Sequence, residues 1–131
     1  MKKIMLFFLL LTTTGFAENL VLENQTPYPA QNQDSTIAIQ WATSAKEVDE
    51  FNKAIMHGVK LNPATFQVLT QPGKINLSIP KNAEYFRVLI WSKNEENPDF
   101  HTNWVDIAPN KTYTLTADHL VPSVLMSGSG C

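Results

Sequence analysis

The segment from Glu84 to Ser92 constrains the fold more than any other part of the chain, because it is apolar on both of its alternating faces. The two sets of side chains are Tyr85, Leu89 and Trp91, and Phe86, Val88 and Ile90. A strand tolerates this pattern only where both of its faces are covered. We therefore predict a central strand here, with other elements packed on each side of its sheet.

Several other segments alternate between apolar and polar residues, which is typical of strands with one buried face. In residues 36–43, for example, Ile37, Ile39 and Trp41 alternate with Ala38, Gln40 and Ala42. The further predicted strands are residues 19–25, 65–70, 74–79, 104–108, 111–117 and, as an edge strand containing Pro122, 120–126. Residues 93–102 are predicted to form a polar loop.

Residues 65–70 and 74–79 flank Pro72-Gly73, which is a turn signal. Two strands joined by such a short turn are expected to pair as a hairpin. Within the first of them, Phe66 and Val68 are expected to point inward.

One segment changes to a helical period. Ser44 and Glu47 have the spacing of a capping box, in which each side chain bonds to backbone amides of the first turn. Val48, Phe51 and Ile55 follow at helical spacing, and Gly58 stands where a glycine often ends a helix. This pattern predicts an α-helix over about residues 45–57, inserted between the second and third strands.

Seven or eight short strands with turns every 8–12 residues are typical of a two-sheet sandwich. We therefore predict a mainly β fold, an immunoglobulin-like or transthyretin-like β-sandwich with one inserted helix. The predicted domain covers residues 18–126, a length that suits a single domain with its own core.

Residues 1–17 have the pattern of a cleavable secretory signal. Lys2 and Lys3 precede an unbroken apolar run over residues 4–11, and Gly15 and Ala17 stand at the two small positions before a cut ahead of Glu18. A retained membrane anchor would need about 20 apolar residues, so the run is too short for one. The compact signal is of a bacterial kind, which predicts a periplasmic or secreted protein with no membrane insertion after cleavage.

Charge argues against two classes of partner. The chain has 10 Lys plus Arg and 12 Asp plus Glu, and removal of Lys2 and Lys3 leaves a net charge of −4. Nucleic-acid binding requires clustered basic residues. With Arg87 as its single arginine, the chain is expected to bind neither nucleic acid nor an anionic membrane surface.

The single cysteine is the last residue, Cys131, and follows a flexible Ser-Gly-Ser-Gly run within residues 127–131. An unpaired cysteine in an exported protein predicts an intermolecular disulfide or a free thiol. The alternative is a tail whose thiol has no role.

No catalytic or metal-binding motif stands out. His57, His101 and His119 lack metal-ligand spacing, and residues 94–99 lack the glycine and alternate acidic spacing of a calcium loop. Asp118, His119 and Ser123 are close in sequence, but a triad is recognised by its geometry in space. We therefore expect no cofactor, no metal ion and no enzymatic activity.

The aromatic residues suggest a binding surface. Trp41 and Trp91 share the apolar faces of their strands and are expected in the core, whereas Tyr28, Phe100 and Trp104 lie in or beside polar loops. With His101, these three residues form the predicted partner surface.

The leading hypothesis is a non-enzymatic protein-binding or structural module of the bacterial envelope, an accessory piece of an envelope or secretion assembly. The alternative is a module that binds carbohydrate or another small ligand.

Overall fold

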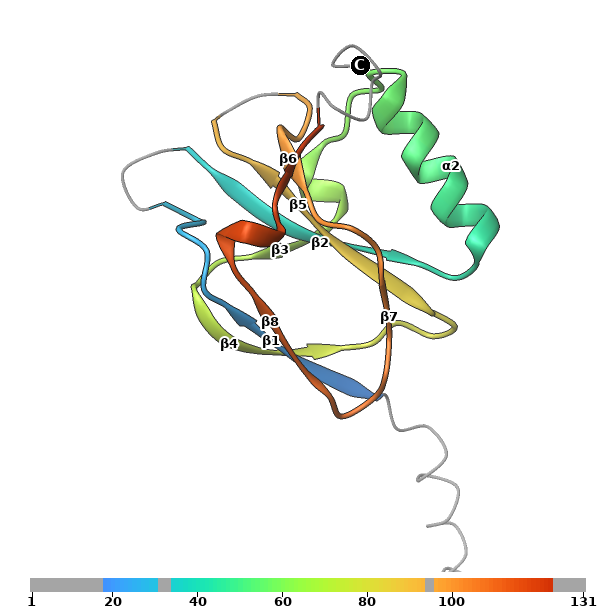
Figure 1. Ribbon diagram of the computed structural model, residues 1–131, viewed down its shortest axis with the longest axis vertical. Coiled ribbons are helices and arrows are strands. Elements are labelled where there is room, and N and C mark those ends of the chain that lie inside the picture. Colours follow the sequence, from blue (N-terminus) through green and yellow to red (C-terminus); the bar gives the residue numbers. More distant parts are fainter. Residues whose placement is uncertain (1–17, 31–33, 94–95, 124–131) are drawn as a thin grey trace, which may run out of the picture.

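The computed structural model describes residues 18–30, 34–93 and 96–123, and these residues form three layers (Figure 1). The predicted signal segment and Cys131 lie outside the described residues. The outer layers are a small sheet and the helix α2 (Ala45–Met56), and a larger sheet lies between them. In the described part of the chain, no helix is long and apolar enough to cross a membrane.

The small sheet, called sheet A, has the strand order β4-β1-β8. Its members are β1 (Asn19–Asn24), β4 (Gly73–Ser78) and β8 (Thr112–Leu115). Strand β1 pairs with β4 in the antiparallel sense and with β8 in the parallel sense, so the first strand is the centre of the sheet.

The larger sheet, called sheet B, has the order β3-β2-β5-β6-β9, and β7 also pairs with β5. Its members are β2 (Thr36–Ala42), β3 (Gln67–Leu69), β5 (Tyr85–Trp91), β6 (Phe100–His101), β7 (Val105–Asp106) and β9 (Val121–Pro122). Short 3-10 turns precede β3 and β9, namely η1 (Pro63–Thr65) and η2 (Ala117–His119). The predicted mainly β sandwich, with its helix between the second and third strands, is confirmed. The immunoglobulin-like or transthyretin-like topology stays a prediction.

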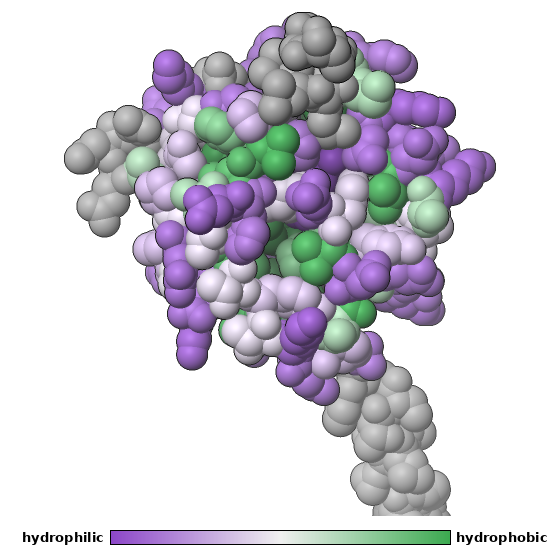
Figure 2. Space-filling model, in the orientation of Figure 1, coloured by the Kyte–Doolittle hydropathy of each residue, from purple (hydrophilic) through white to green (hydrophobic). Residues whose placement is uncertain are grey.

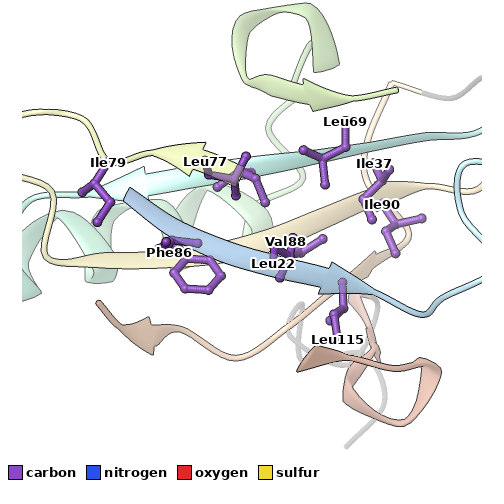
Figure 3. Close-up of a cluster of buried hydrophobic side chains, with 11 residues drawn as sticks. Leu22, Ile37, Leu69, Leu77, Ile79, Phe86, Val88, Ile90 and Leu115 are labelled. Atoms are coloured by element: carbon purple, nitrogen blue, oxygen red, sulfur yellow. The ribbon is translucent and has the colours of Figure 1, made fainter. Parts of the chain in front are cut away.

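Strand β5 is buried on both faces, as its sequence predicted. Phe86, Val88 and Ile90 face sheet A and join the main core (Figure 3). The other buried members of this core are Leu20, Leu22, Ile37, Ile39, Leu69, Leu77, Ile79 and Leu115. Leu89 and Trp91 face the helix and form a second cluster with Ala38 and Ile55. The centre of sheet B thus supports two separate cores.

The helix begins where the capping pattern placed it. The Ser44 hydroxyl accepts a hydrogen bond from the Glu47 amide at 3.1 Å, and the Glu47 carboxylate accepts one from the Thr43 amide at 2.7 Å. Gly58 follows the helix with a φ of 70°, a conformation that glycine adopts without strain. Because α2 covers β2, the Ala38, Gln40 and Ala42 side of that strand is also buried, and the prediction of a single buried face was wrong.

The predicted hairpin of residues 65–70 and 74–79 is also wrong. Strand β3 pairs with β2, where Leu69 lies opposite Ile37, whereas β4 pairs with β1, where Leu77 lies opposite Leu20. The turn at Pro72-Gly73 therefore carries the chain from one sheet to the other, and Gly73 has a φ of 91° there. Phe66, just before β3, packs against the second cluster and so points inward as predicted. Within β3 the faces are inverted, because Leu69 is 4% exposed and Val68 is 41% exposed.

The inverted faces of β3 give a first testable prediction. Leu69→Ala should lower the free energy of unfolding by about 2–5 kcal/mol, because it leaves a cavity in the main core. Val68→Ala, one residue away, should change it by no more than about 0.5 kcal/mol, as is usual at exposed sites. Urea unfolding of the two variants measures both values, and equal effects would contradict the register.

Candidate functional site

Two of the predicted partner-surface residues lie in a strand rather than in a loop. Phe100 and His101 form β6, within the segment predicted to be irregular, and they lie opposite Ile90 and Leu89 of β5. Residues directly opposite each other share a face of the sheet. Phe100 therefore points toward the main core and is half-buried there, whereas His101 points toward the helix side.

His101 is 4% exposed, so its side chain does not contribute to a surface. Its Nδ1 lies 3.0 Å from the hydroxyl oxygen of Ser123. Burial, followed by repulsion from the charged Arg87, lowers the pKa of His101 to about 4. The imidazole is therefore neutral at neutral pH, and it is buried on the helix-side face of sheet B.

Trp104 packs on the helix side through a group of side chains that we call the Arg87 cluster: Gln40, Phe51, Asn52, Arg87 and Trp104. The Trp104 ring stacks on Phe51 with centroids 6.1 Å apart, and the Arg87 guanidinium carbon lies 4.5 Å from the Trp104 centroid. Asn52 Oδ1 accepts hydrogen bonds from Trp104 Nε1 at 2.9 Å and from Arg87 Nη1 at 3.0 Å. The cluster therefore ties α2, β5 and the chain before β7 together.

Arg87 itself is 1% exposed, and its Nε donates to Gln40 Oε1 at 2.6 Å. No carboxylate of the described residues pairs with it. Burial lowers the pKa of Arg87 to about 10, so the guanidinium still carries its charge at neutral pH. Neutral oxygen acceptors and the face of the Trp104 ring surround this charge, so Arg87 connects the elements packed around it.

Tyr28 is half-buried and packs against the main core, as Phe100 does. The loop before it is held by Asn24, whose Nδ2 donates to the Tyr28 carbonyl at 2.8 Å and whose Oδ1 accepts from the Thr26 amide at 3.1 Å. Tyr28, Phe100 and Trp104 are partly exposed, as predicted, but Tyr28 and Phe100 pack against the main core whereas Trp104 packs on the helix side. The structure therefore gives no single aromatic patch made of the four predicted residues.

A different site opens between the two sheets. A cavity of about 270 Å³ lies between β8 of sheet A and the β5, β6 and β7 region of sheet B. Its buried lining is apolar except for Thr102, and four exposed polar residues, which we call its polar mouth, also line it. Figure 2 shows apolar surface bordered by hydrophilic surface on the face viewed there. The apolar lining includes Leu22, Phe86, Val88, Val105 and Leu115, and the polar residues are Asn103, Thr114, Asp118 and His119.

The cavity exists because the sheets differ in width. Sheet A ends at β8, whereas sheet B continues past β5 to β6, β7 and β9. Val105 lies opposite Phe86 and so faces the space between the sheets, where no described strand of sheet A covers it. The described strands of sheet A therefore do not extend over this part of sheet B.

The free edge of β8 borders the cavity. Val21 N donates to Lys111 O at 3.0 Å and Gln25 N to Leu115 O at 2.8 Å, so alternate residues of β8 direct their backbone groups to β1. Successive strand residues use opposite sides for these groups. The amides and carbonyls of Thr112 and Thr114 therefore point to the side on which β8 has no neighbour among the described strands.

The polar mouth has a defined chemistry. His119 Nδ1 accepts a hydrogen bond from the Thr116 amide at 3.0 Å, so the neutral ring carries its proton on Nε2. Asp118 forms no salt bridge within the part of the chain that the structure describes. The mouth can therefore offer a hydrogen-bond donor and a carboxylate to a group that enters the cavity.

Tyr113 of β8 also lines this cavity and is fixed in place. Its hydroxyl donates to the Asp106 carbonyl at 2.9 Å and accepts from the Ala108 amide at 2.8 Å, while its ring meets Phe86 edge-on with centroids 5.2 Å apart. The wall formed by β8 is therefore pre-organised rather than loose.

The triplet Asp118, His119 and Ser123 does not assemble. Asp118 and His119 line the cavity, whereas Ser123 bonds to the buried His101. Within the described residues, no group of three His, Cys, Asp or Glu side chains could hold a metal ion. The sequence contained one signal for the candidate site, the alternation of residues 111–117, but that pattern does not show which strand lies at an edge of its sheet.

Comparisons with known proteins do not narrow the function. The chain matches no family model, and neither the curated proteins nor the solved structures yielded a significant match. The geometry of the cavity and of the β8 edge is therefore the basis for assigning a function.

The buried histidine predicts a pH dependence of stability. Its pKa is about 4 in the folded state against 6.5 as the ordinary value, so between these values the unfolded chain binds a proton that the folded chain does not. The free energy of unfolding therefore has its full value, as far as His101 is concerned, above pH 6.5, and it decreases as the pH falls toward 4. From pH 7 to pH 4.5, the free energy of unfolding should fall by about 2 kcal/mol more in the wild type than in His101→Asn.

The variant His101→Asn retains an amide near the position of Nδ1, within reach of Ser123. His57→Asn, at an exposed position, is the matched control and should keep the wild-type loss. Urea unfolding at a series of pH values measures all three proteins. Parallel curves for the wild type and His101→Asn would show that His101 titrates normally in the folded state.

Proposed function

We propose that this chain is an exported, non-enzymatic module that binds a partner protein at the open side of its sandwich. The observation that carries the proposal is the cavity into the apolar core, beside the edge of β8 that has no neighbour among the described strands. Protein interfaces commonly depend on a few anchor side chains that enter desolvated pockets. A cavity lined by Leu22, Phe86 and Val88 suits an apolar anchor of this kind.

The size of the cavity favours an anchor side chain of a partner protein over a drug-sized ligand. Small-molecule sites are typically about 300–1,000 Å³ and enclose most of their ligand. At about 270 Å³, this cavity is below that range and suits one or two side chains. This reasoning keeps protein contact as the leading function and moves the expected contact from the aromatic loop to the side of β8.

Export rests on the sequence of residues 1–17. A cut before Glu18 leaves β1 complete, since β1 begins at Asn19 and the Glu18 carbonyl still accepts from the Ile79 amide at 2.8 Å. Expression of the full chain in a bacterial host should yield periplasmic protein whose N-terminal residue is Glu18, as read by intact mass. Lys2→Glu with Lys3→Glu should reduce export, and full-length cytoplasmic protein from the wild-type chain would refute the signal.

The polar mouth favours a second candidate function, the binding of a small amphipathic ligand. His119 and Asp118 could hold its polar group while its apolar part enters the cavity. Native mass spectrometry of the protein purified from its host tests this directly, because a bound ligand adds a discrete mass. A complex with a second protein instead supports the leading proposal.

A cavity-filling variant tests the site itself. Val105 is half-buried and lines the cavity, so Val105→Trp should fill the cavity. The affinity for the partner should fall at least tenfold, because the partner's anchor side chain can no longer enter. Val68→Trp is the control, since it adds the same side chain at an exposed site on β3, at the other end of sheet B. Affinity of the purified partner for each variant, measured by calorimetry, gives the result.

Both variants should first show cooperative thermal unfolding, so that loss of binding is not loss of fold. Weakened binding in Val105→Trp alone supports the site. Equal affinity of Val105→Trp and the wild type would place the contact elsewhere and remove the cavity from the proposal.

A further inference from the structure

We infer that the partner supplies an extended segment that becomes a fourth strand of sheet A, hydrogen-bonded to β8 and with an apolar side chain in the cavity. This inference rests on the proposed function and specifies how the partner is recognised. Addition of a strand to an exposed sheet edge is a general mode of peptide recognition, in which backbone bonds supply affinity and pockets for alternate side chains supply specificity.

The free edge of β8 differs from the other sheet edges of the described chain. Strand β9 ends sheet B with Pro122, which has no amide to donate, and β3 is three residues long. Strand β4, the other edge of sheet A, contains the charged residue Lys74. Natural edges are usually protected by such devices or by charged residues. Strand β8 has the sequence Thr-Tyr-Thr-Leu, with neither proline nor charge, so its outward backbone groups at Thr112 and Thr114 can accept a neighbour.

The added strand would pack on the face of sheet B. A strand beside β8 would lie about 4.8 Å from it and about 10 Å above sheet B, which is the normal spacing of a sandwich. Val105 and Thr102 lie beneath that position and line the cavity. Every second side chain of the added segment would point down into the cavity, so the segment must alternate apolar and polar residues.

Charge specifies one more property of the segment. Asp118 lines the mouth and forms no salt bridge with the described residues, and the chain from Glu18 onward has more acidic than basic residues. A lysine or arginine near the end of the segment would meet this carboxylate and gain affinity that falls with salt. The inferred ligand is thus an extended protein segment with alternating apolar residues and a flanking cation.

A tethered probe tests the inference on the full chain. The probe is the segment Lys-Thr-Val-Thr-Phe-Thr-Lys, joined after Cys131 through a flexible Gly-Ser linker, with Cys131→Ser to prevent disulfides. Tethering gives an effective concentration in the millimolar range, so weak binding becomes visible. Hydrogen exchange of the Thr112 and Thr114 amides should slow by at least about tenfold, because both amides gain an acceptor in the added strand.

Two matched probes separate the contributions. A scrambled segment of the same composition, Lys-Val-Phe-Thr-Thr-Thr-Lys, should leave exchange at Thr112 and Thr114 unchanged because its apolar residues no longer alternate. A chemically ligated segment with N-methylated amides on the side that faces β8 keeps the side chains but cannot complete the ladder, and it should also give no protection. Asp118→Asn should weaken protection by the alternating probe and reduce its salt dependence.

The outcomes distinguish this inference from the proposed function. Protection by the alternating probe alone supports strand addition. A second outcome is that the methyl resonances of Val88 and Val105 shift equally with the alternating and N-methylated probes while the Thr112 and Thr114 amides stay unprotected. Side chains then dock without a strand, which overturns the inference. The cavity remains the binding site in that case. If neither amides nor methyls respond, strand addition is also overturned, and the comparison of Val105→Trp with Val68→Trp decides the proposed function separately.

Discussion

The requirement that β5 be covered on both faces organises the whole molecule. One face of β5 is covered by sheet A and the other by α2, so the described residues form three layers. Arg87 lies on the helix face of this strand, where a charge is costly unless its donors are bonded. Gln40, Asn52 and the Phe51 carbonyl accept hydrogen bonds from these donors, and the Trp104 ring covers the guanidinium. These contacts fix the position of α2 and of the chain before β7. A buried charge at the centre of sheet B thus specifies how the outer elements are placed.

Local structure could be predicted where a few residues decide it. Ser44 and Glu47 place the helix start, and the double apolar pattern of residues 85–91 identifies the central strand. The assignment of β3 and β4 could not be predicted, because alternation identifies a strand without identifying its neighbour. Val68 and Leu69 are both apolar, so the pattern gave the wrong face of β3. Gln40 was expected in solvent, and only its distant partner Arg87 explains its burial.

The candidate site was harder to predict than the fold, for a physical reason. The cavity is lined by β1, β5, the chain through β7, β8 and η2, and no short stretch of sequence contains enough of it to form a motif. Thr112 and Thr114 have the composition of ordinary solvent-facing strand positions, and only the strand order shows that their backbone groups lack a neighbour. Conversely, the aromatic residues suggested a surface, but Phe100 and Trp104 belong to opposite faces of sheet B. Residue type alone could not separate these cases.

The parallel pairing of β1 with β8 has a consequence for the order in which the chain folds. Leu22 lies beside Tyr113, so the centre of sheet A joins strands separated by about 90 residues of sequence. Contacts over such a separation form late, because the intervening loop must first be closed at an entropic cost. During synthesis, β1 has no β8 to pair with until nearly the whole chain has left the ribosome. A nascent chain therefore cannot complete sheet A until β8 has left the ribosome, and until then one edge of its first strand stays without a partner.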